Sequence, residues 1–333
     1  MMINLIWWNE PSSLFEYESI ISLLSGFNVN HIVDLQQKVG YDNAIIVANL
    51  TNVLCRGQGG FRFLKNYGRY TNERHRLHNY IKALKNAGTK VGLFHVGDEF
   101  YIESTDFYQD CDFVFRQNHK EEAHKIHKSC HYLPLCCKAG FSSQVIDKPI
   151  HERPYMWSFA GQLKSSRYKM IKYAKKIPGG KYRTTSQFND PNGLNAEGYA
   201  ALLSNTKFSL CPGGNYTVDC SRVLESLEAG AIPIIEAKNF RHALQRLFNP
   251  KLLINHGIRD RRFWLRNYRY WERAYSTDFP CPLIYDWKDL EALISSIDVK
   301  SSSQKIRLWW KEYKHSFDEL IRLTIEDAFS QKA

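Results

Sequence analysis

The segment FSLCPGGNYTVDCSRVLESLEAGAIPIIE, residues 208–236, guides the interpretation of the whole chain. It begins with a short apolar run that a Pro-Gly-Gly sequence at 212–214 interrupts. Residues 218–229 then place apolar side chains at helical spacing, and Gly230 follows as a stop signal. Residues 231–235 form a second apolar run of the length and composition of a buried strand. The order is therefore strand, glycine loop, helix and strand.

The glycine loop and the helix after it form a potential phosphate site. Asp219 or Ser221 can cap the start of this helix. A helix N-terminus offers free backbone N–H groups and the positive end of the helix dipole to an anion. Arg222 lies on the first turn with a fork that matches a diphosphate, and Glu225 one turn later suits two ribose hydroxyls. An ordinary βαβ unit with a glycine turn has the same spacing, so both interpretations stay open.

This segment resembles the signature of the exostosin family of glycosyltransferases, in which a C-P-x-G loop precedes the pattern S/P-R-x-x-E-A/S-x-x-x-G-x-I-P-V/I-I. Residues 92–100 and 113–118 resemble the N-terminal half of the ribitol xylosyltransferase-like branch. Residues 157–167 resemble the strand and loop that open the donor half. The residues that match the signature are Cys211, Pro212, Gly214, Ser221, Arg222, Glu225, Gly230, Ile232, Pro233, Ile234 and Ile235.

The resemblance implies an α/β fold of the B type of glycosyltransferases, with two Rossmann-like domains that face a central cleft. In that fold the C-terminal half binds a nucleotide-sugar donor, expected here to be UDP-linked. The N-terminal half binds the acceptor, here a glycan or a polyol-phosphate-type molecule. Retaining enzymes of this type often carry a glutamate eight residues before the position of Glu225, whereas this chain has Thr217 there. We therefore expect an inverting reaction, as the resemblance also implies.

The expected donor site combines the glycine loop with the loop after the predicted strand at 156–161. The general rule that open α/β sheets bind ligands at the carboxyl ends of their strands places a ligand here as well. Arg167 should face the diphosphate from the first loop, although a solvated helix residue is an equal alternative. The expected donor-binding residues are Gly161, Arg167, Cys211, Pro212, Gly213, Gly214, Asn215, Ser221, Arg222 and Glu225.

An inverting reaction needs a base that takes the proton of the acceptor hydroxyl. Asp98 and Glu99 directly follow the predicted strand at 91–96, so both lie at the carboxyl end of that strand and are the candidate catalytic residues. A helix cap or a salt bridge to one of the many arginines is the structural alternative. Beyond the next strand, Arg116 and Asn118 can bind an acidic or phosphorylated acceptor.

Arg56, next to the glycine-rich residues 57–60, has the same possible acceptor role, with a solvated loop as the alternative. Residues 110–112 have the Asp-x-Asp form that binds metal in A-type transferases, but they precede a strand instead of following one. We interpret them as a turn and expect no obligatory metal or other cofactor. The eight cysteines are scattered, and the His and Cys residues at 124–137 fit no common zinc-finger spacing.

Length and charge limit the remaining possibilities. A chain of 333 residues with 44% hydrophobic residues can build two domains of about 150 residues each. The formal net charge is +11, concentrated at 56–90, 164–183 and 259–273. Such a charge favours nucleotide sugars, acidic glycans, an anionic membrane surface or nucleic acid as partners. Basic and aromatic residues alternate at 259–273. We interpret this segment as an amphipathic helix in which Phe263, Tyr270 and Trp271 are buried, and we favour this interpretation over a surface that stacks on nucleobases.

Alternating strand and helix patterns predict a parallel sheet in each half. We expect an acceptor-side domain at 1–150, a nucleotide-sugar-binding domain at 151–303, and an amphipathic helix at 304–333 that packs back on the N-terminal domain. No apolar run reaches the roughly 18 residues that cross a bilayer, and the N-terminus fits a first strand better than a signal peptide. These features predict a cytoplasmic protein, with peripheral membrane association left open.

Two alternatives to an active UDP-sugar enzyme follow from the same residues. One is a basic glycan- or nucleic-acid-binding protein on an inactive transferase fold, although nucleic acid is not the partner we expect. The presence of both Arg222 and Glu225 argues against this alternative. The other is a B-type enzyme that uses a CMP-linked acidic sugar.

Overall fold

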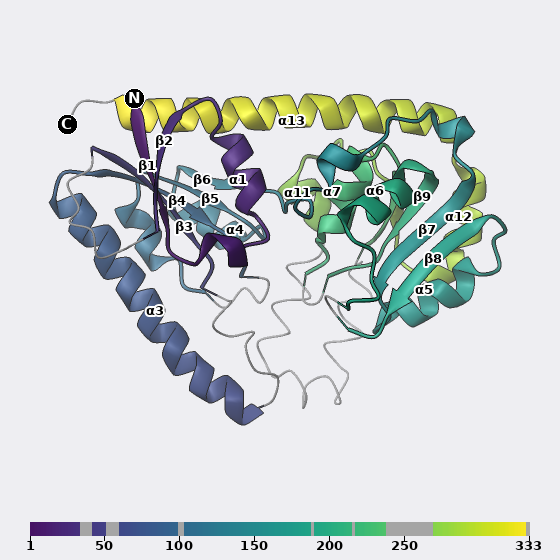
Figure 1. Cartoon of the computed structure of the whole chain (residues 1–333), viewed down its shortest axis with the longest axis horizontal. Coiled ribbons are helices and arrows are strands. Elements are labelled where there is room, and N and C mark those ends of the chain that lie inside the picture. Colours follow the sequence, from purple (N-terminus) through teal and green to yellow (C-terminus); the bar gives the residue numbers. More distant parts are fainter. Residues whose placement is uncertain are drawn as a thin grey trace. The chain divides into compact units, whose positions relative to one another are not determined.

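The computed structural model describes residues 1–33, 42–50, 60–98, 103–187, 190–214, 217–237 and 269–330. The chain divides into two compact units (Figure 1). Unit 1 consists of Met1–Pro134 and Ser316–Ala333, and unit 2 of Leu135–His315. The chain thus returns to unit 1 near its C-terminus, within helix α13 (Val299–Ser330).

Unit 1 is built on a six-stranded parallel sheet with the order β2-β1-β3-β4-β5-β6. The order reverses between β1 and β3, as in doubly wound α/β folds. Nearly every residue of β1, β3, β4 and β5 is buried, because both faces of the sheet are covered. The strands are β1 (Met2–Trp7), β2 (Asn28–Ile32), β3 (Asn43–Ala48), β4 (Lys90–His95), β5 (Phe113–Arg116) and β6 (Cys130–Tyr132).

Two apolar cores lie on the two faces of this sheet, since alternate residues of a strand point to opposite sides. On one face, Leu77, Ile81 and Leu84 of α3 pack with strand residues such as Ile46. The other core includes residues of α1 together with Ile321, Ile325 and Phe329 of α13. The helices of this unit are α1 (Tyr17–Leu23), α3 (Gly60–Asn86) and α4 (Glu121–Ile126), with short 3-10 turns η1 (Pro11–Ser13) and η2 (Asp106–Asp110).

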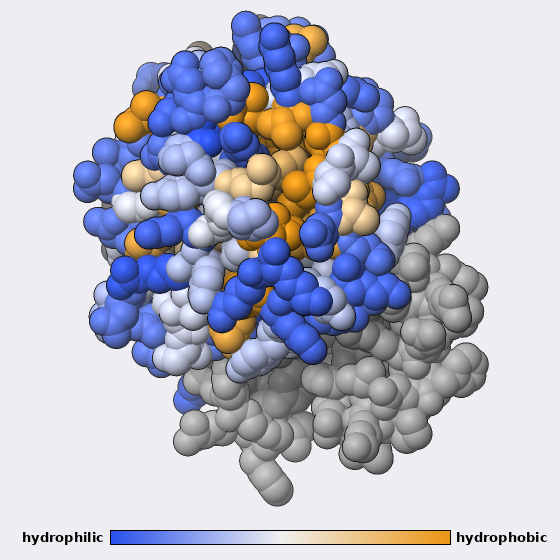
Figure 2. Space-filling view, turned by 90° about the vertical axis from the view of Figure 1, so that its right-hand side faces the viewer, coloured by the Kyte–Doolittle hydropathy of each residue, from blue (hydrophilic) through white to orange (hydrophobic). Residues whose placement is uncertain are grey.

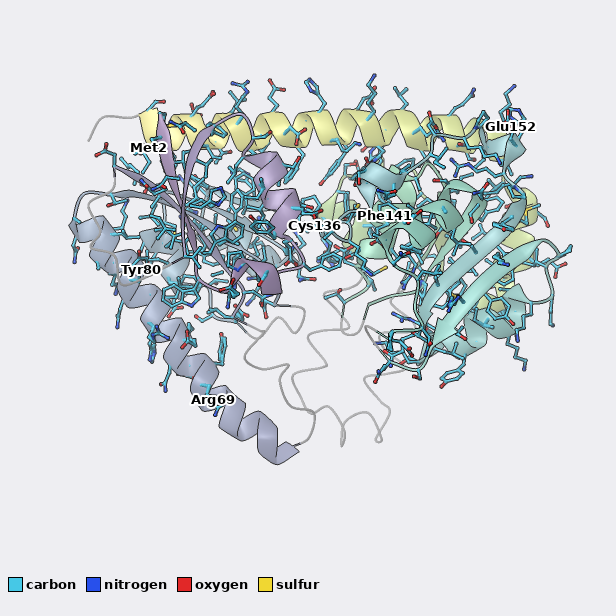
Figure 3. All side chains as sticks on the ribbon, viewed as in Figure 1. Met2, Arg69, Tyr80, Cys136, Phe141 and Glu152 are labelled. Carbon is cyan, nitrogen blue, oxygen red and sulfur yellow. The ribbon has the colours of Figure 1, made fainter. Side chains whose placement is uncertain are left out.

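Unit 2 is built on a five-stranded parallel sheet with the order β11-β10-β9-β7-β8, which reverses between β7 and β9. Phe141 is buried in this unit and packs on Tyr199, with ring centroids 5.7 Å apart (Figure 3). The strands are β7 (Tyr155–Gln162), β8 (Gly180–Thr185), β9 (Thr206–Cys211), β10 (Ile232–Glu236) and β11 (Leu283–Ile284). The helices are α5 (Ser166–Ala174), α6 (Ala196–Ser204), α7 (Ser221–Glu228), α11 (Tyr270–Ala274) and α12 (Leu290–Ser296), with 3-10 turns η3 (Ser142–Gln144), η4 (Ile150–Glu152) and η5 (Trp287–Asp289).

The predicted α/β class with two parallel sheets is confirmed, and the opening segment folds as β9, a loop, α7 and β10 in the predicted order. The predicted contact of the last helix with the first sheet is confirmed by the core that Ile321, Ile325 and Phe329 share with it. Among the described helices, none combines the length and the apolar character required to span a bilayer.

Candidate functional site

The reversal of strand order between β7 and β9 marks the place where an open α/β sheet binds its ligand. At such a point the loops after two neighbouring strands lead to opposite faces of the sheet and leave a crevice at the carboxyl ends. In unit 2 these loops follow Gln162 on β7 and Cys211 on β9. Both are the loops that the sequence pattern proposed for a donor diphosphate.

Arg167 connects these two loops. It lies on the first turn of α5, where Nη1 donates to the carbonyl oxygen of Gln162 at 2.9 Å and Nη2 to that of Gly213 at 3.1 Å. The residue is 8% exposed. Burial, followed by the nearby positive charge of Arg222, lowers the pKa of Arg167 to about 10. The guanidinium therefore lies in a region that already has a positive potential.

Arg222 approaches the same point from the first turn of α7. Its Nη2 donates to the carbonyl oxygen of Ala160 at 3.2 Å, and its guanidinium carbon lies 5.1 Å from the ring centroid of Phe159. Its Nε is buried without an acceptor in the described part of the chain. Gly161 makes this approach possible, since a Cβ there would lie 2.8 Å from Nη2 of Arg222, and its φ of 143° suits glycine.

Neither Arg167 nor Arg222 forms an ion pair with a carboxylate among the residues that the structure describes. Two neighbouring guanidiniums repel each other and are costly to bury unless an anion neutralises them. Their forks suit phosphate oxygens better than any other common anion except a carboxylate. The arrangement can therefore hold a phosphate or diphosphate.

Glu236 fixes the glycine loop through hydrogen bonds. Sequence reasoning missed this role. Its Oε2 accepts hydrogen bonds from the backbone N–H of Gly213 at 3.2 Å and from Oγ of Ser166 at 2.7 Å. Glu236 ends β10, the strand next to β9, so its carboxylate reaches the loop from the neighbouring strand. The signal available in the sequence was a carboxylate as the last residue of a buried strand. Gly214 faces the loop's own backbone, since a Cβ there would lie 2.6 Å from the carbonyl oxygen of Asp219.

The start of α7 differs from the predicted capping. Cys220 is the N-cap residue and makes no side-chain capping bond. Asp219, proposed as a cap, instead accepts a hydrogen bond from the hydroxyl of Tyr270 at 2.9 Å. Ser221 is the first helical residue, so it is not the cap either. The backbone N–H of Val223 donates to the carbonyl oxygen of Cys220 at 3.0 Å, so the N–H groups of Ser221 and Arg222 are those that can bind an anion at this helix start.

Glu225 and Cys211 are both buried. One oxygen of Glu225 accepts a hydrogen bond from the backbone N–H of Lys138 at 3.1 Å, and burial raises the pKa of this carboxyl group. Cys211 is fully buried, and burial raises the pKa of its thiol to about 12, so it is a neutral packing residue. Pro212 follows it at the start of the loop and is buried. Asn215 lies outside the described residues.

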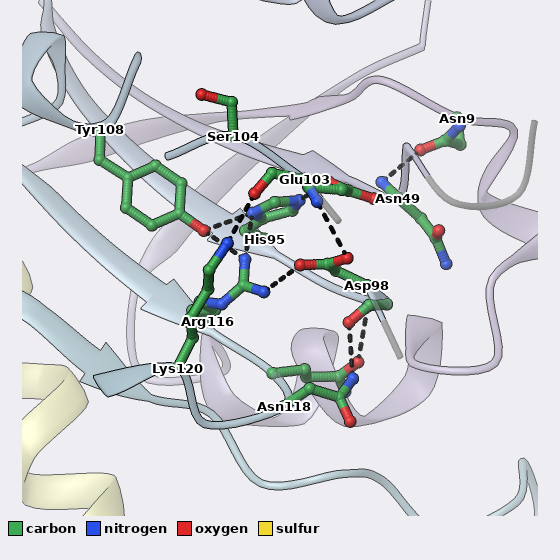
Figure 4. Close-up of polar contacts among 12 residues, drawn as sticks. Asn9, Asn49, His95, Asp98, Glu103, Ser104, Tyr108, Arg116, Asn118 and Lys120 are labelled. Atoms are coloured by element: carbon green, nitrogen blue, oxygen red, sulfur yellow. Dashed lines mark hydrogen bonds and ion pairs between the residues drawn. The ribbon is translucent and has the colours of Figure 1, made fainter. Parts of the chain in front are cut away.

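In unit 1, the carboxyl ends of β4 and β5 carry a buried polar network (Figure 4). The guanidinium of Arg116 forms an ion pair with the carboxylate of Asp98, and both residues are 0% exposed. Asp98 and Asn118 adopt left-handed backbone conformations, with φ of 54° and 55°. Nδ2 of Asn118 donates to the carbonyl oxygen of Gly97 at 2.6 Å, which fastens the two strand-end loops to each other. Glu99 lies outside the described residues.

The second half of this network surrounds His95, the last residue of β4. Its Nε2 contacts a carboxylate oxygen of Glu103, and its Nδ1 contacts the hydroxyl of Tyr108. Nη1 of Arg116 donates to that hydroxyl at 2.7 Å, and Nζ of Lys120 donates to the carbonyl oxygen of Glu103 at 2.8 Å. Burial, then the charge of Arg116, lowers the pKa of His95 to about 3, so its imidazole is neutral at physiological pH. Asp98 and Arg116 are thus part of a fully enclosed structure, which matches the salt-bridge alternative for Asp98.

Unit 1 has a reversal of strand order of its own, between β1 and β3, which sequence reasoning did not identify. Oδ1 of Asn9, after β1, accepts a hydrogen bond from the backbone N–H of Asn49, after β3, at 2.7 Å. The half-buried ring of Trp8 lies beside them, 5.8 Å from the ring of Tyr80, with the guanidinium of Arg76 5.6 Å from its centroid. Arg56 lies outside the described residues.

The two acidic residues of the Asp-x-Asp sequence at 110–112 are bonded to neighbouring groups of the protein. Asp110 contacts His78 at 2.7 Å, and Asp112 contacts Lys85 at 2.8 Å and the backbone N–H of Val91 at 2.6 Å. Within the described ranges, no three His, Cys, Asp or Glu side chains are grouped as metal ligands. Tyr270 and Trp271 are buried as expected, while residues 259–268 and Phe263 with them fall outside the description.

Comparison with known proteins gives only distant likenesses. No family model matches the chain, and no curated protein matches its sequence. Among solved structures, an alpha1,3-fucosyltransferase matches with 12% identity and a TM-score of 0.38, over 90% of this chain and 91% of that chain. A UDP-glucosyltransferase from Polygonum tinctorium matches with 8% identity and a TM-score of 0.38, over 99% of both chains. A carbohydrate transporter from Acidothermus cellulolyticus 11B matches with 9% identity and a TM-score of 0.22, over 91% and 99%. Scores this low identify neither a family nor an activity.

Proposed function

We propose that the protein is an inverting, metal-independent glycosyltransferase of the B type, with exostosin-like character, that uses a nucleotide-sugar donor. The observation that carries this proposal is the pair Arg167 and Arg222. Both guanidiniums converge on the β7/β9 reversal without a carboxylate partner among the described residues. A binding site for a diphosphate needs these groups, whereas a purely structural loop does not.

In the proposed reaction, an acceptor hydroxyl oxygen attacks the anomeric carbon of the donor sugar. The bond from that carbon to the diphosphate oxygen breaks, and the nucleoside diphosphate leaves with the electron pair. Arg167, Arg222 and the uncapped N–H groups of α7 stabilise the negative charge that develops on the leaving oxygen. Ser221 can add its hydroxyl at the start of that helix. Glu225 remains the proposed ribose ligand, with one of its oxygens already engaged by Lys138.

The acceptor side of the proposal concerns unit 1. A base must take the acceptor proton, and of the two candidates that follow β4, Asp98 and Glu99, we propose Glu99, because Asp98 is enclosed in its ion pair with Arg116. Because Asp98 is enclosed with Arg116, we propose that this pair positions the loop after β4, and that Asn118 does the same from β5. Arg56 remains a proposed contact for an anionic acceptor.

Ligand-induced thermal stabilisation tests the donor assignment. The protein would be heated with UDP, GDP, CMP and their common sugars, with EDTA and with added manganese. A ligand at about 100 times its Kd adds about 2.7 kcal/mol to the free energy of unfolding. We expect a shift with UDP and UDP-sugars that EDTA does not change and that Arg167→Ala abolishes. Lys172→Ala, which alters an exposed lysine on the same helix, should keep the shift.

The outcomes separate the alternatives. A shift with CMP or CMP-sugars alone would replace the UDP assignment by a CMP-linked acidic sugar. A shift that requires manganese would refute metal independence. If no nucleotide shifts the melting temperature, the transferase proposal fails. The long stretch of basic residues in unit 2 then favours the second candidate, a basic binding protein.

A further inference from the structure

The longest stretch of the chain in which every charged residue is basic lies in unit 2 and takes little part in the proposed donor site. Residues 153–189 contain no Asp or Glu. They contain nine basic residues, Arg153, Lys164, Arg167, Lys169, Lys172, Lys175, Lys176, Lys181 and Arg183. Of these, Arg153 is buried against backbone carbonyls and Arg167 belongs to the donor site. Lys169 pairs with Asp286 at 2.7 Å.

The exposed remainder forms a continuous surface that we call the basic edge. It consists of Lys172, Lys175 and Lys176 around the end of α5, and Lys181 and Arg183 on β8. All five are exposed, and none has an ion pair in the described part of the chain. β8 is the last strand of its sheet, which explains why Gly180 to Thr184 are exposed on both sides.

Aromatic rings lie among these cations. Tyr168 is 61% exposed and shares a helix face with Lys172 and Lys175, which follow it by four and seven residues. Tyr182 is 41% exposed and stacks on Trp157 with ring centroids 6.0 Å apart. Nζ of Lys175 lies 5.2 Å from the ring of Tyr182, so helix and strand join into one surface. The side of unit 2 with α5 and β8 faces the viewer in Figure 2, where hydrophilic side chains border a band of hydrophobic ones.

We propose that the basic edge docks unit 2 onto an anionic membrane surface. A cluster of lysines without neutralising acids is attracted to a plane of negative headgroups, with each cation contributing to the affinity. Tyrosine rings suit the headgroup level because they are apolar with one polar end. The proposal is independent of the transfer reaction, since it uses none of the residues that would bind the donor.

The composition of the edge favours lipid over nucleic acid. Four of its five cations are lysines, which act as point charges and lack the planar fork that reads phosphates and bases. The one arginine, Arg183, already donates from Nε to the carbonyl oxygen of Asn192 at 2.8 Å. Exposed lysines on an edge strand also prevent strand-to-strand aggregation, and that simpler role is the alternative.

Co-sedimentation of the full-length protein with vesicles tests the proposal. We expect binding to phosphatidylcholine vesicles that contain phosphatidylserine, at about 0.1 M salt, and loss of binding at about 0.5 M. The variant Lys172→Gln, Lys175→Gln, Lys176→Gln should bind roughly 100-fold more weakly, at about fivefold per lysine. A matched control changes three exposed lysines of α13, Lys300→Gln, Lys305→Gln, Lys311→Gln, with the same change in net charge. It should keep most of the affinity.

Three results would overturn the proposal. Equal weakening in both triple variants would mean that net charge acts without a specific surface. If the wild-type protein does not bind anionic vesicles, the role that remains for these lysines is to prevent aggregation through the edge strand. Tighter binding to short single-stranded RNA, lost in the α5 variant but not in the control, would assign the edge to nucleic acid. Circular dichroism melting confirms that each variant is folded before its binding is compared.

Discussion

Each unit places an arginine at the carboxyl end of its parallel sheet, but the two surroundings differ. In unit 1, Arg116 is fully enclosed and its charge is neutralised by Asp98. In unit 2, Arg167 and Arg222 both reach the reversal between β7 and β9 and bond to backbone carbonyls, without an ion pair to a carboxylate among the described residues. A neutralised charge holds loops together, whereas an unneutralised pair is prepared for an anion. The same residue type at the same topological position thus has a structural role in one unit and a proposed binding role in the other.

The largest expected effect is the loss of the buried pair in unit 1. Arg116→Ala would leave Asp98 as an unpaired buried charge and should reduce the free energy of unfolding by about 3–5 kcal/mol. Urea denaturation followed by tryptophan fluorescence measures this. Arg322→Ala, which breaks an exposed pair with Glu326, is the control and should change stability by less than about 0.5 kcal/mol. Similar losses in both variants would contradict the contrast between enclosed and exposed arginines.

In unit 2 the corresponding change should affect binding more than stability. Arg167→Ala removes two hydrogen bonds to backbone carbonyls but also removes repulsion from Arg222. Affinity for the nucleoside diphosphate should fall by about 2–3 kcal/mol, or roughly 30- to 150-fold, since hydrogen bonds to charged groups contribute that much. Isothermal titration calorimetry measures the affinity, with Lys172→Ala as the control. A stability loss as large as that of Arg116→Ala, with unchanged affinity, would make Arg167 structural.

Acidification should weaken unit 1 specifically. His95 has a folded-state pKa of about 3, below the ordinary value of 6.5, so the unfolded chain binds its proton first. The stability is complete above pH 6.5 and falls as the pH falls toward 3, by about 2 kcal/mol at pH 5. Burial also lowers the pKa of His124 and His131, which adds to the loss. Urea denaturation at about pH 7.5 and pH 5 tests this, and His95→Gln should flatten the dependence. Equal stability at both pH values would refute it.

The smallest expected effect concerns Gly161, which lies next to the guanidinium of Arg222. Gly161→Ala introduces a Cβ that would lie 2.8 Å from Nη2, at a φ of 143° that disfavours alanine. It should cost about 1–2 kcal/mol and displace the guanidinium, so that nucleotide affinity falls as well. Gly26→Ala, where a Cβ meets nothing within 4 Å, is the control in both measurements. An unchanged affinity in Gly161→Ala would show that the precise position of Arg222 does not matter.

Local pattern explains why β9, α7 and β10 were predictable from the sequence. An apolar run, a glycine break, a helical stripe and Gly230 each act within a few residues, so no distant contact has to be known. The same holds for the strand ends that carry Asp98 and Arg116. Their pairing was not predictable, because it depends on β4 and β5 being neighbours in the sheet. For this reason sequence reasoning assigned Asp98 and Arg116 to separate roles.

The contacts that hold the glycine loop show the same limit. Gly213 and Glu236 are 23 residues apart, and Gly213 and Arg167 are 46 apart. Only the strand order β10-β9-β7 brings them together. The prediction that Asp219 caps its helix was wrong for the same reason. Its carboxylate accepts a hydrogen bond from Tyr270, which lies 51 residues away in the sequence. The last helix, predicted to be amphipathic, was also only partly interpretable, since Leu320 is 37% exposed while its neighbour Ile321 is buried.

The return of α13 to unit 1 has a consequence for the order of events on the ribosome. One face of the first sheet is covered in part by Ile321, Ile325 and Phe329, which are synthesised after the strands of both units. Until they emerge, apolar residues such as Phe113, whose ring lies 5.6 Å from that of Phe329, lack part of their cover. Unit 2, by contrast, has all its residues before position 316. Unit 1 therefore begins before unit 2 but completes its core after it, opposite to the usual N-terminal-first order of domain folding.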